Sequence, residues 1–250
     1  MTEENKTANP RFPVFHVPHD GLLIQGRIGM FCVPEEKVRY YHDQMRDKHV
    51  AELIPPEYRN RESTVRFHFS RLMCDVERRK GPDEIMERYG MGVSYEKAYD
   101  GTVINRKPWA RWEILQYYGR HHGWMNIVCA RHPRVLLIDL HSYHDDIVLP
   151  DFRIPGRRFP DLCIGMDSRF TPPDLLAVVL KRFKEIGLTT DVNYPYSGTY
   201  IPGAMEGGTD TGRFAGIMLE FHRRAYLDRK ENMEKIREAI RKVIADAAYI

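Results

Sequence analysis

The stretch Arg134-Val-Leu-Leu-Ile-Asp-Leu140 is the clearest buried-strand signal in the chain, and it runs directly into His141-Ser142-Tyr143. A short, nearly continuous apolar run of this kind is typical of a strand covered on both faces, as in the parallel sheets of α/β proteins. The pattern therefore predicts a buried strand that stops at polar residues.

Outward from this stretch, short apolar runs alternate with amphipathic stretches. The expected strands are 12–18, 64–69, 72–76, 134–140, 161–165, 189–193 and 214–221, and the expected helices are 34–53, 109–124, 172–186 and 228–248. Because strands and helices alternate, we expect an α/β fold of three layers, α/β/α, with a mixed, mostly parallel central sheet.

The length and composition are those of an ordinary globular chain. It has 250 residues, of which 42% are hydrophobic and 29% are charged. This length suits one large domain or two small ones, and no internal repeat or linker divides the sequence. We expect a single domain over 1–250, with 1–11 as a flexible leader.

Charge and cysteine content exclude several classes of protein. The chain has 38 Lys and Arg against 35 Asp and Glu, a net charge of +3 without a concentrated basic run, which argues against nucleic acid as a partner. No run approaches 18 apolar residues and the polar N-terminus lacks a signal-peptide pattern, so we expect no membrane partner. The four cysteines form no C-x-x-C pair, which favours a reduced, cytoplasmic setting.

Two long stretches show no regular period. Residues 81–108 and 194–212 are rich in glycine and proline. Long irregular segments in a compact domain are more often functional than idle, so we expect these two to cover a binding site.

Polar residues that end apolar runs are the first candidates for a site, because ligands of open α/β sheets bind beyond the carboxyl ends of strands. Four places meet this criterion: His19, the segment Asp75 to Arg78, His141 and Glu220. A glutamate within a buried run is costly, and only a metal, a basic partner or a raised pKa makes it tolerable.

Each candidate also has a purely structural interpretation. A histidine at a strand end is as often structural as a ligand, Asp75 could bind a backbone amide, and Arg78 could be solvated. Glu220 could pair with Arg223 or Arg224. The other histidines of the chain that we interpret as structural or surface residues are His16, His42, His68, His132 and His144.

Five segments resemble, in order along the chain, those of a known family. They are Val17-Pro-His-Asp-Gly21, Ser70-Arg-Leu-Met-Cys-Asp-Val-Glu-Arg78, Leu137-Ile-Asp-Leu-His-Ser142, Pro160-Asp-Leu-Cys-Ile-Gly165, and Leu219-Glu220 followed by Tyr226. The family is that of the N-formylglutamate amidohydrolases, and the resemblance spans about Phe15 to Asp228. This family is similar in turn to the zinc carboxypeptidases and aspartoacylases. The resemblance therefore implies that the chain has their phosphorylase/hydrolase-like α/β/α fold.

The resemblance implies a metal site with one zinc per chain. His19 and His141 resemble the two zinc-binding histidines, and a catalytic zinc needs a third protein ligand. The carboxypeptidases place a glutamate three residues after the first histidine, where this chain has Leu22. Asp47 matches an acidic position of the amidohydrolases and is the expected replacement, while Asp75 is either an alternative ligand or the acceptor that orients a zinc-bound imidazole.

The resemblance also implies catalytic and substrate-binding residues. Glu220 resembles the glutamate that acts as general base. Arg71 and Arg78 are expected to bind a substrate carboxylate, because a guanidinium matches a carboxylate bidentately, and Asn193 is assigned to substrate binding as well. Glu77 stands where the family commonly has asparagine, and it adds negative charge beside an anionic substrate.

We therefore expect a zinc-dependent hydrolase that cleaves the amide of a small, anionic N-acyl amino acid, with N-formyl-L-glutamate as the type substrate and formate and L-glutamate as products. One alternative is a zinc carboxypeptidase or cell-wall peptide amidase. Another, motivated by Leu22 and Glu77, is a binding protein that keeps the fold without catalysis. The oligomeric state is not predicted.

Overall fold

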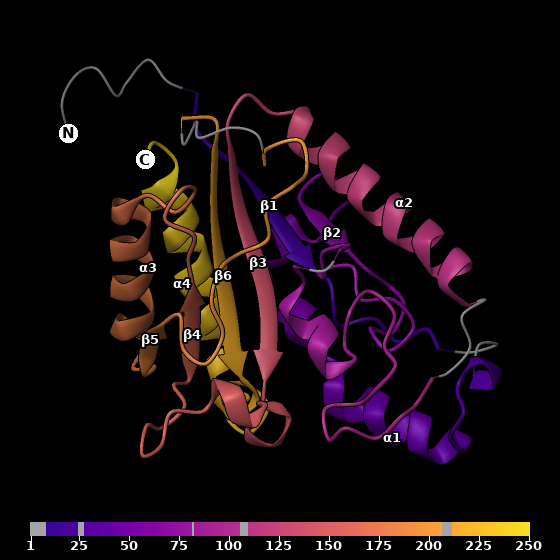
Figure 1. The fold of residues 1–250 in the computed structure, drawn as a ribbon. Helices are drawn as coiled ribbons and strands as arrows, with labels where there is room; N and C mark the ends of the chain where they lie inside the picture. Colours follow the sequence, from indigo (N-terminus) through magenta and orange to yellow (C-terminus); the bar gives the residue numbers. More distant parts are fainter. Residues whose placement is uncertain (1–8, 25–27, 82, 106–109, 207–211) are drawn as a thin grey trace.

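A six-stranded sheet forms the centre of the computed structural model, which describes residues 9–24, 28–81, 83–105, 110–206 and 212–250 (Figure 1). The strands are β1 (Phe12–Val17), β2 (Thr64–Arg66), β3 (Val135–Tyr143), β4 (Leu162–Gly165), β5 (Thr190–Val192) and β6 (Phe214–His222). Their order in the sheet is β2-β1-β3-β6-β4-β5. Most of the expected leader, residues 1–8, lies outside the described residues.

The sheet is mixed and mostly parallel, as the sequence predicts. β2, β1, β3 and β6 run parallel to one another, β4 pairs antiparallel with β6, and β5 is parallel to β4. Nine residue pairs align β3 with β6, and both strands are buried along their whole length. The carboxyl ends of β1, β3 and β6 therefore lie at one edge of the sheet.

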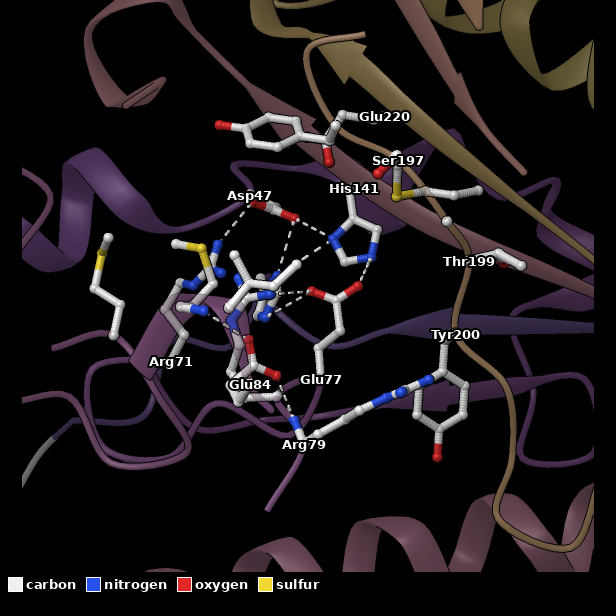
Figure 2. A pocket seen from close by; sticks show the side chains of 18 of the residues that line it. Asp47, Arg71, Glu77, Arg79, Glu84, His141, Ser197, Thr199, Tyr200 and Glu220 are labelled. Carbon is white, nitrogen blue, oxygen red and sulfur yellow. Dashed lines mark hydrogen bonds and ion pairs between the residues drawn. The ribbon is translucent and has the colours of Figure 1, made fainter. Parts of the chain in front are cut away.

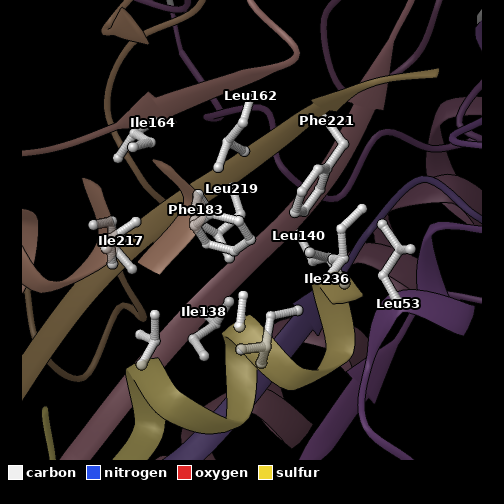
Figure 3. Close-up of a cluster of buried hydrophobic side chains, with 14 of the residues drawn as sticks. Leu53, Ile138, Leu140, Leu162, Ile164, Phe183, Ile217, Leu219, Phe221 and Ile236 are labelled. Carbon is white, nitrogen blue, oxygen red and sulfur yellow. The ribbon is translucent and has the colours of Figure 1, made fainter. Parts of the chain in front are cut away.

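Helices cover both faces of the sheet (Figure 1). On one face α3 (Pro173–Glu185) and α4 (Asn232–Ala247) pack against alternate strand residues such as Ile138, Leu219 and Phe221 (Figure 3). On the other face α2 (Ala110–Ala130) packs against the intervening apolar residues. Since successive strand side chains point to opposite faces, Asp139, His141 and Glu220 lie on the face that α2 covers. None of the described helices is long and apolar enough to cross a membrane.

The expected helix 34–53 is wrong in its second half. α1 (Glu35–Met45) ends where Arg46 adopts an extended conformation, and Asp47 lies in the following loop. Long-range contacts hold this loop outside the helix: Arg223 Nη2 donates to the carbonyl of Arg46 over 2.6 Å, and the amide of Asp47 donates to the carbonyl of His19. Tertiary hydrogen bonds therefore override a helix-forming sequence that contains no proline or glycine at this point.

The expected strand 72–76 is also wrong. The segment is buried but forms turns, in which the amide of Met73 donates to the carbonyl of Ser70 and the amide of Asp75 donates to the carbonyl of Val93. A short buried apolar run does not distinguish a strand from an irregular buried segment. As a result, Asp75 to Arg78 are carried by a turn beside the sheet.

Smaller differences concern element ends. β2 covers only the first half of the expected strand 64–69, and α2 continues six residues beyond the expected end at Trp124. β3 extends to Tyr143, so His141 lies within the strand and not after it. The described part of 81–108 contains the 3-10 helix Ile85–Tyr89 and is otherwise irregular, as expected.

Candidate active site

Three buried side chains from three parts of the chain meet at the carboxyl edge of the sheet. His19 follows β1, Asp47 follows α1, and His141 lies on β3. The Nδ1 atoms of His19 and His141 are 3.2 Å apart, and Asp47 Oδ2 lies 3.2 Å from Nδ1 of His141 and 3.7 Å from Nδ1 of His19. The structure therefore brings together the three residues that the sequence assigns to a metal.

The opposite nitrogen of each imidazole faces carboxylates. Nε2 of His19 is 2.8 Å from Asp75 Oδ1, and Nε2 of His141 is 3.0 Å from both Asp139 Oδ1 and Glu77 Oε1. Figure 2 shows Asp47 and Glu77 both pointing toward the His141 ring. Because an ionised carboxylate only accepts hydrogen bonds, each Nε2 is placed to donate to its carboxylate. In the tautomer that carries its proton on Nε2 alone, the Nδ1 atoms of the two rings present lone pairs toward each other and toward Asp47.

This arrangement suits a divalent cation. Two ligand atoms bound tetrahedrally at the usual zinc distances are about 3.3–3.4 Å apart, close to the separations found among His19 Nδ1, His141 Nδ1 and Asp47 Oδ2. Asp47 Oδ1 is buried and has no hydrogen-bond partner in the described part of the chain. It lies 3.9 Å from Nη1 of Arg71, while the donor set and the distances around Oδ2 fit zinc.

Two other groups of possible ligands lie close by, but both use atoms that are already bonded. One consists of His19, Asp75 and Glu77, and the other of Glu77, Asp139 and His141. In each, the imidazole contributes the Nε2 atom that donates to a carboxylate. We therefore favour Asp47 as the third ligand and Asp75 as the acceptor that orients His19.

Asp75 connects the two histidines to the arginines of the site. Its fully buried carboxylate accepts hydrogen bonds from His19, from the hydroxyl of Tyr95 over 2.7 Å and from Arg71 Nη2 over 3.0 Å. Arg78 Nε lies 3.4 Å away. Burial alone would raise the pKa of Asp75, but His19, Arg78 and Arg71 hold it well below its usual range.

Glu220 faces the same centre from the neighbouring strand. It pairs in register with His141, so both side chains lie on one face of the sheet. No hydrogen bond or ion pair to another described residue holds its carboxylate. Burial raises the pKa of Glu220 to about 8; the nearby carboxylates of Asp47 and Glu77 add to this rise, and His141 opposes it. A carboxyl group in this state can exchange a proton near neutral pH.

The alternative in which Glu220 pairs with a surface arginine is wrong. Arg224 donates through Nε to Asp161 over 3.0 Å, and Arg223 donates to the backbone carbonyls of Gln44 and Arg46. Both guanidiniums are therefore engaged elsewhere, and Glu220 points into a cavity (Figure 2).

This cavity has a volume of about 640 Å³ and is lined by His19, Asp47, Arg71, Arg78, His141 and Glu220 among others. The described parts of both irregular segments contribute to its walls, through 83–86 and 195–201. Asn193 does not line it. Its Oδ1 accepts hydrogen bonds from the amides of Met166 and Gly198, so it supports the second of these segments from behind.

A further buried network was not anticipated from the sequence. Asp139 Oδ1 accepts hydrogen bonds from His141 and, over 2.8 Å, from Nδ1 of His16, while Nε2 of His16 lies 2.9 Å from Nε2 of His121. From the sequence alone we interpret His16 as a structural residue and assign no role to Asp139. The sequence did contain a signal for Asp139. An aspartate within the most apolar strand of the chain is costly to bury without a partner, as is Glu220.

Comparisons with known proteins agree with this geometry. The family model for N-formylglutamate amidohydrolase matches residues 13–227. A solved N-formylglutamate amidohydrolase from Ralstonia eutropha JMP134 is similar with a TM-score of 0.72 and 20% identity, over 96% of this chain and 92% of that one. A solved gene product of Agrobacterium tumefaciens gives 0.61 and 15%, over 97% and 98%. At these identities the two structures show a shared fold. No curated protein matches the chain.

Proposed function

This chain belongs to the N-formylglutamate amidohydrolase family, and from that premise we propose that it hydrolyses the amide bond of a small N-acyl amino acid, with N-formyl-L-glutamate as the type substrate. The observation that carries the proposal is the convergence of His19 Nδ1, His141 Nδ1 and Asp47 Oδ2 on one point beside Glu220. The products are formate and L-glutamate.

We propose that His19, His141 and Asp47 hold one zinc ion per chain. When bound, zinc supplies a Lewis acid for the acyl carbonyl and lowers the pKa of water at that position. Asp75 and Asp139 keep the two imidazoles in the tautomer that presents Nδ1, and their buried carboxylates prevent either ring from turning.

Glu220 is the general base of this proposal. Its carboxylate takes one proton from the attacking water as the oxygen bonds to the acyl carbon. The same carboxyl then gives that proton to the amide nitrogen as the carbon–nitrogen bond breaks, so the amine leaves neutral and the acyl group leaves as an acid. Burial of Glu220, which raises its pKa, helps the carboxyl to keep the proton between these two transfers.

Arg78 and Arg71 hold the substrate carboxylate in different ways. Arg78 pairs with Asp75 through Nε at 3.4 Å, and its Nη1 comes no closer than 3.7 Å to Glu77, so we assign its two terminal nitrogens to the substrate carboxylate. Arg71 already binds Asp75 and Tyr95, and it contributes positive charge and support from behind. The segments 83–86 and 195–201 restrict the access of bulk water to the cavity.

We also propose a cytoplasmic location. It is supported by the four cysteines, none of which forms a disulfide. Reduced thiols are the usual state in that compartment.

The test is formate release from N-formyl-L-glutamate by the wild type and by Glu220→Gln. The amide cannot accept the proton, so we expect turnover to fall about 100-fold or more while the fold and metal content are retained. Glu238→Gln, an exposed change on α4, serves as the control and keeps full activity. Unchanged turnover in Glu220→Gln would contradict the assignment of the base.

A further inference from the structure

Asp139 is a fully buried carboxylate at which three parts of the chain meet. Its Oδ1 accepts hydrogen bonds from Nε2 of His141 over 3.0 Å and from Nδ1 of His16 over 2.8 Å. Its Oδ2 accepts a hydrogen bond from the amide of Tyr200 over 2.9 Å. A buried carboxylate is costly unless its oxygens are hydrogen-bonded, so these three donors together make the position of Asp139 tolerable.

His16 is the donor that fixes this carboxylate from the neighbouring strand. It lies on β1, aligns in register with Asp139 on β3, and has no exposed surface. Its opposite nitrogen, Nε2, lies 2.9 Å from Nε2 of His121 on α2. The imidazole of His16 is therefore held through both of its nitrogens, and it cannot turn without breaking one of these contacts.

The same imidazole supports a wall of the cavity. Its ring lies against that of Tyr200, with 4.2 Å between the two ring centroids. The hydroxyl of Tyr200 lies 2.7 Å from Nδ1 of His122, which follows His121 on α2. Tyr200 belongs to the segment 195–201 that lines the cavity (Figure 2). His16 thus contacts both the carboxylate behind His141 and the segment that closes one side of the site.

The route from His16 to the proposed metal site passes through one oxygen atom. His16 does not line the cavity, and within the described part of the chain its hydrogen bonds go to Asp139 and His121. His141 shares Oδ1 of Asp139 with it. The χ2 torsion of an aspartate is soft, so a carboxylate turns readily unless hydrogen bonds fix it. The second donor on Oδ1 therefore fixes the acceptor to which Nε2 of His141 is bonded.

We propose that His16 is a positioning residue of the active site, which acts through Asp139 to fix the direction in which His141 presents Nδ1. This inference rests on the proposed zinc site and deepens it by adding a histidine that touches neither the metal nor the substrate. Loss of a group that orients a metal ligand typically weakens metal binding 10- to 100-fold. Because His16 acts one contact further away, we expect a loss of about tenfold.

Two substitutions of His16 test this role. Leucine occupies a similar volume without a donor, whereas the side-chain amide of asparagine can place an N–H near the position of Nδ1. Competition with a chromogenic chelator should show zinc affinity about tenfold lower in His16→Leu and close to that of the wild type in His16→Asn. Wild-type affinity in His16→Leu, or equal losses in the two variants, would overturn the inference.

His132→Leu is the matched control for the loss of an imidazole on β1. His132 stacks on Phe12 at the opposite end of this strand, with 3.6 Å between the ring centroids, so its substitution should leave zinc affinity unchanged. A loss in His132→Leu equal to that in His16→Leu would mean that any disturbance of β1 weakens the site, and would overturn the specific role of His16.

A double variant tests whether His16 acts through Asp139. Effects of residues that share one hydrogen-bond network are not additive. In a chain that already carries Asp139→Ala, His16→Leu should therefore lower zinc affinity no further. Losses that add up in the double variant would contradict the route through Asp139.

The N–H protons bonded to Asp139 provide a readout that needs no metal. Imidazole N–H protons that donate to a buried carboxylate resonate far downfield in proton NMR spectra. In the metal-free chain, His16→Leu should remove the signal of His16 and shift that of His141, and His132→Leu should leave both unchanged. An unshifted His141 signal in His16→Leu would overturn the inference. If the wild type binds no zinc, the proposed metal site fails, while these signals still decide the role of His16.

Discussion

The Nδ1 atoms of His19 and His141 lie 3.2 Å apart, while the Nε2 atom of each ring lies within 3.0 Å of a buried carboxylate. The carboxylates favour the tautomers with a proton on Nε2, in which the two Nδ1 lone pairs and the Asp47 carboxylate face one point. Without a cation these three acceptors repel one another, and a cation bound at this point would be coordinated by all three. The chemistry proposed for the chain depends on this relationship.

Asp139 should affect the metal without touching it. Asp139→Asn weakens the acceptor that orients His141, and we expect zinc affinity to fall about 10- to 100-fold. Competition with a chromogenic chelator measures this. Asp161→Asn is the matched control, since Asp161 is also buried but bonds to Thr189 and Arg224. Equal zinc affinity in Asp139→Asn and the wild type would show that Asp139 does not orient the ligand.

We expect Arg78 to bind the substrate carboxylate through two N–H donors of its planar guanidinium. Arg78→Lys keeps the charge but loses bidentate binding, so we expect kcat/KM to fall about 10- to 100-fold, mostly through KM. Arg79→Lys, at the exposed part of the cavity, should change kcat/KM by less than about threefold. Similar effects of the two substitutions in steady-state kinetics would argue against Arg78 as the carboxylate site.

His42 should make stability dependent on pH. Its side chain contacts Ser70, and burial, helped by Arg46, lowers the pKa of His42 to about 4. Between the unfolded value near 6.5 and this folded value, only the unfolded chain binds the proton, so stability is full above pH 6.5 and decreases as the pH falls toward 4. Burial lowers the pKa of His122 to about 4 in the same way.

Denaturant unfolding between pH 4 and 7 tests this pH dependence. Each such histidine contributes a slope of about 1.4 kcal/mol per pH unit near pH 5. His42→Gln should remove one such contribution and leave that of His122. An identical pH dependence in the variant and the wild type would mean that His42 is protonated equally in both states.

The strands and helices with a regular apolar pattern could be predicted from the sequence, because that pattern lies within each segment and does not depend on distant residues. The apolar run of β3 and the alternation of strands with amphipathic helices gave the mixed sheet and the helices on both faces. The end of α1 at Met45 could not be predicted, since Arg223 and the carbonyl of His19 hold the following loop from distant parts of the chain. The turn at 72–76 was mistaken for a strand because burial alone does not determine backbone conformation.

Some residues of the site could likewise be predicted from the sequence, and others could be identified only from the fold. His19, His141 and Glu220 stood out because polar groups at the ends of buried strands need an explanation. Asp47 was placed by family resemblance, and only the fold shows that it reaches both imidazoles. Asp139 lies two residues before His141 on the same face of β3, a spacing that the sequence contained and that becomes meaningful once the strand is known to extend through both.

The most direct measurement is the metal content of the chain purified without added metal, compared with His141→Ala and His144→Ala prepared in the same way. His144 follows β3 and binds the carbonyl of Gln44, so its substitution controls for a nearby loss of an imidazole. We predict about one zinc per chain in the wild type and in His144→Ala, and none in His141→Ala. A wild type that contains no metal and takes up none on titration with zinc would contradict the account.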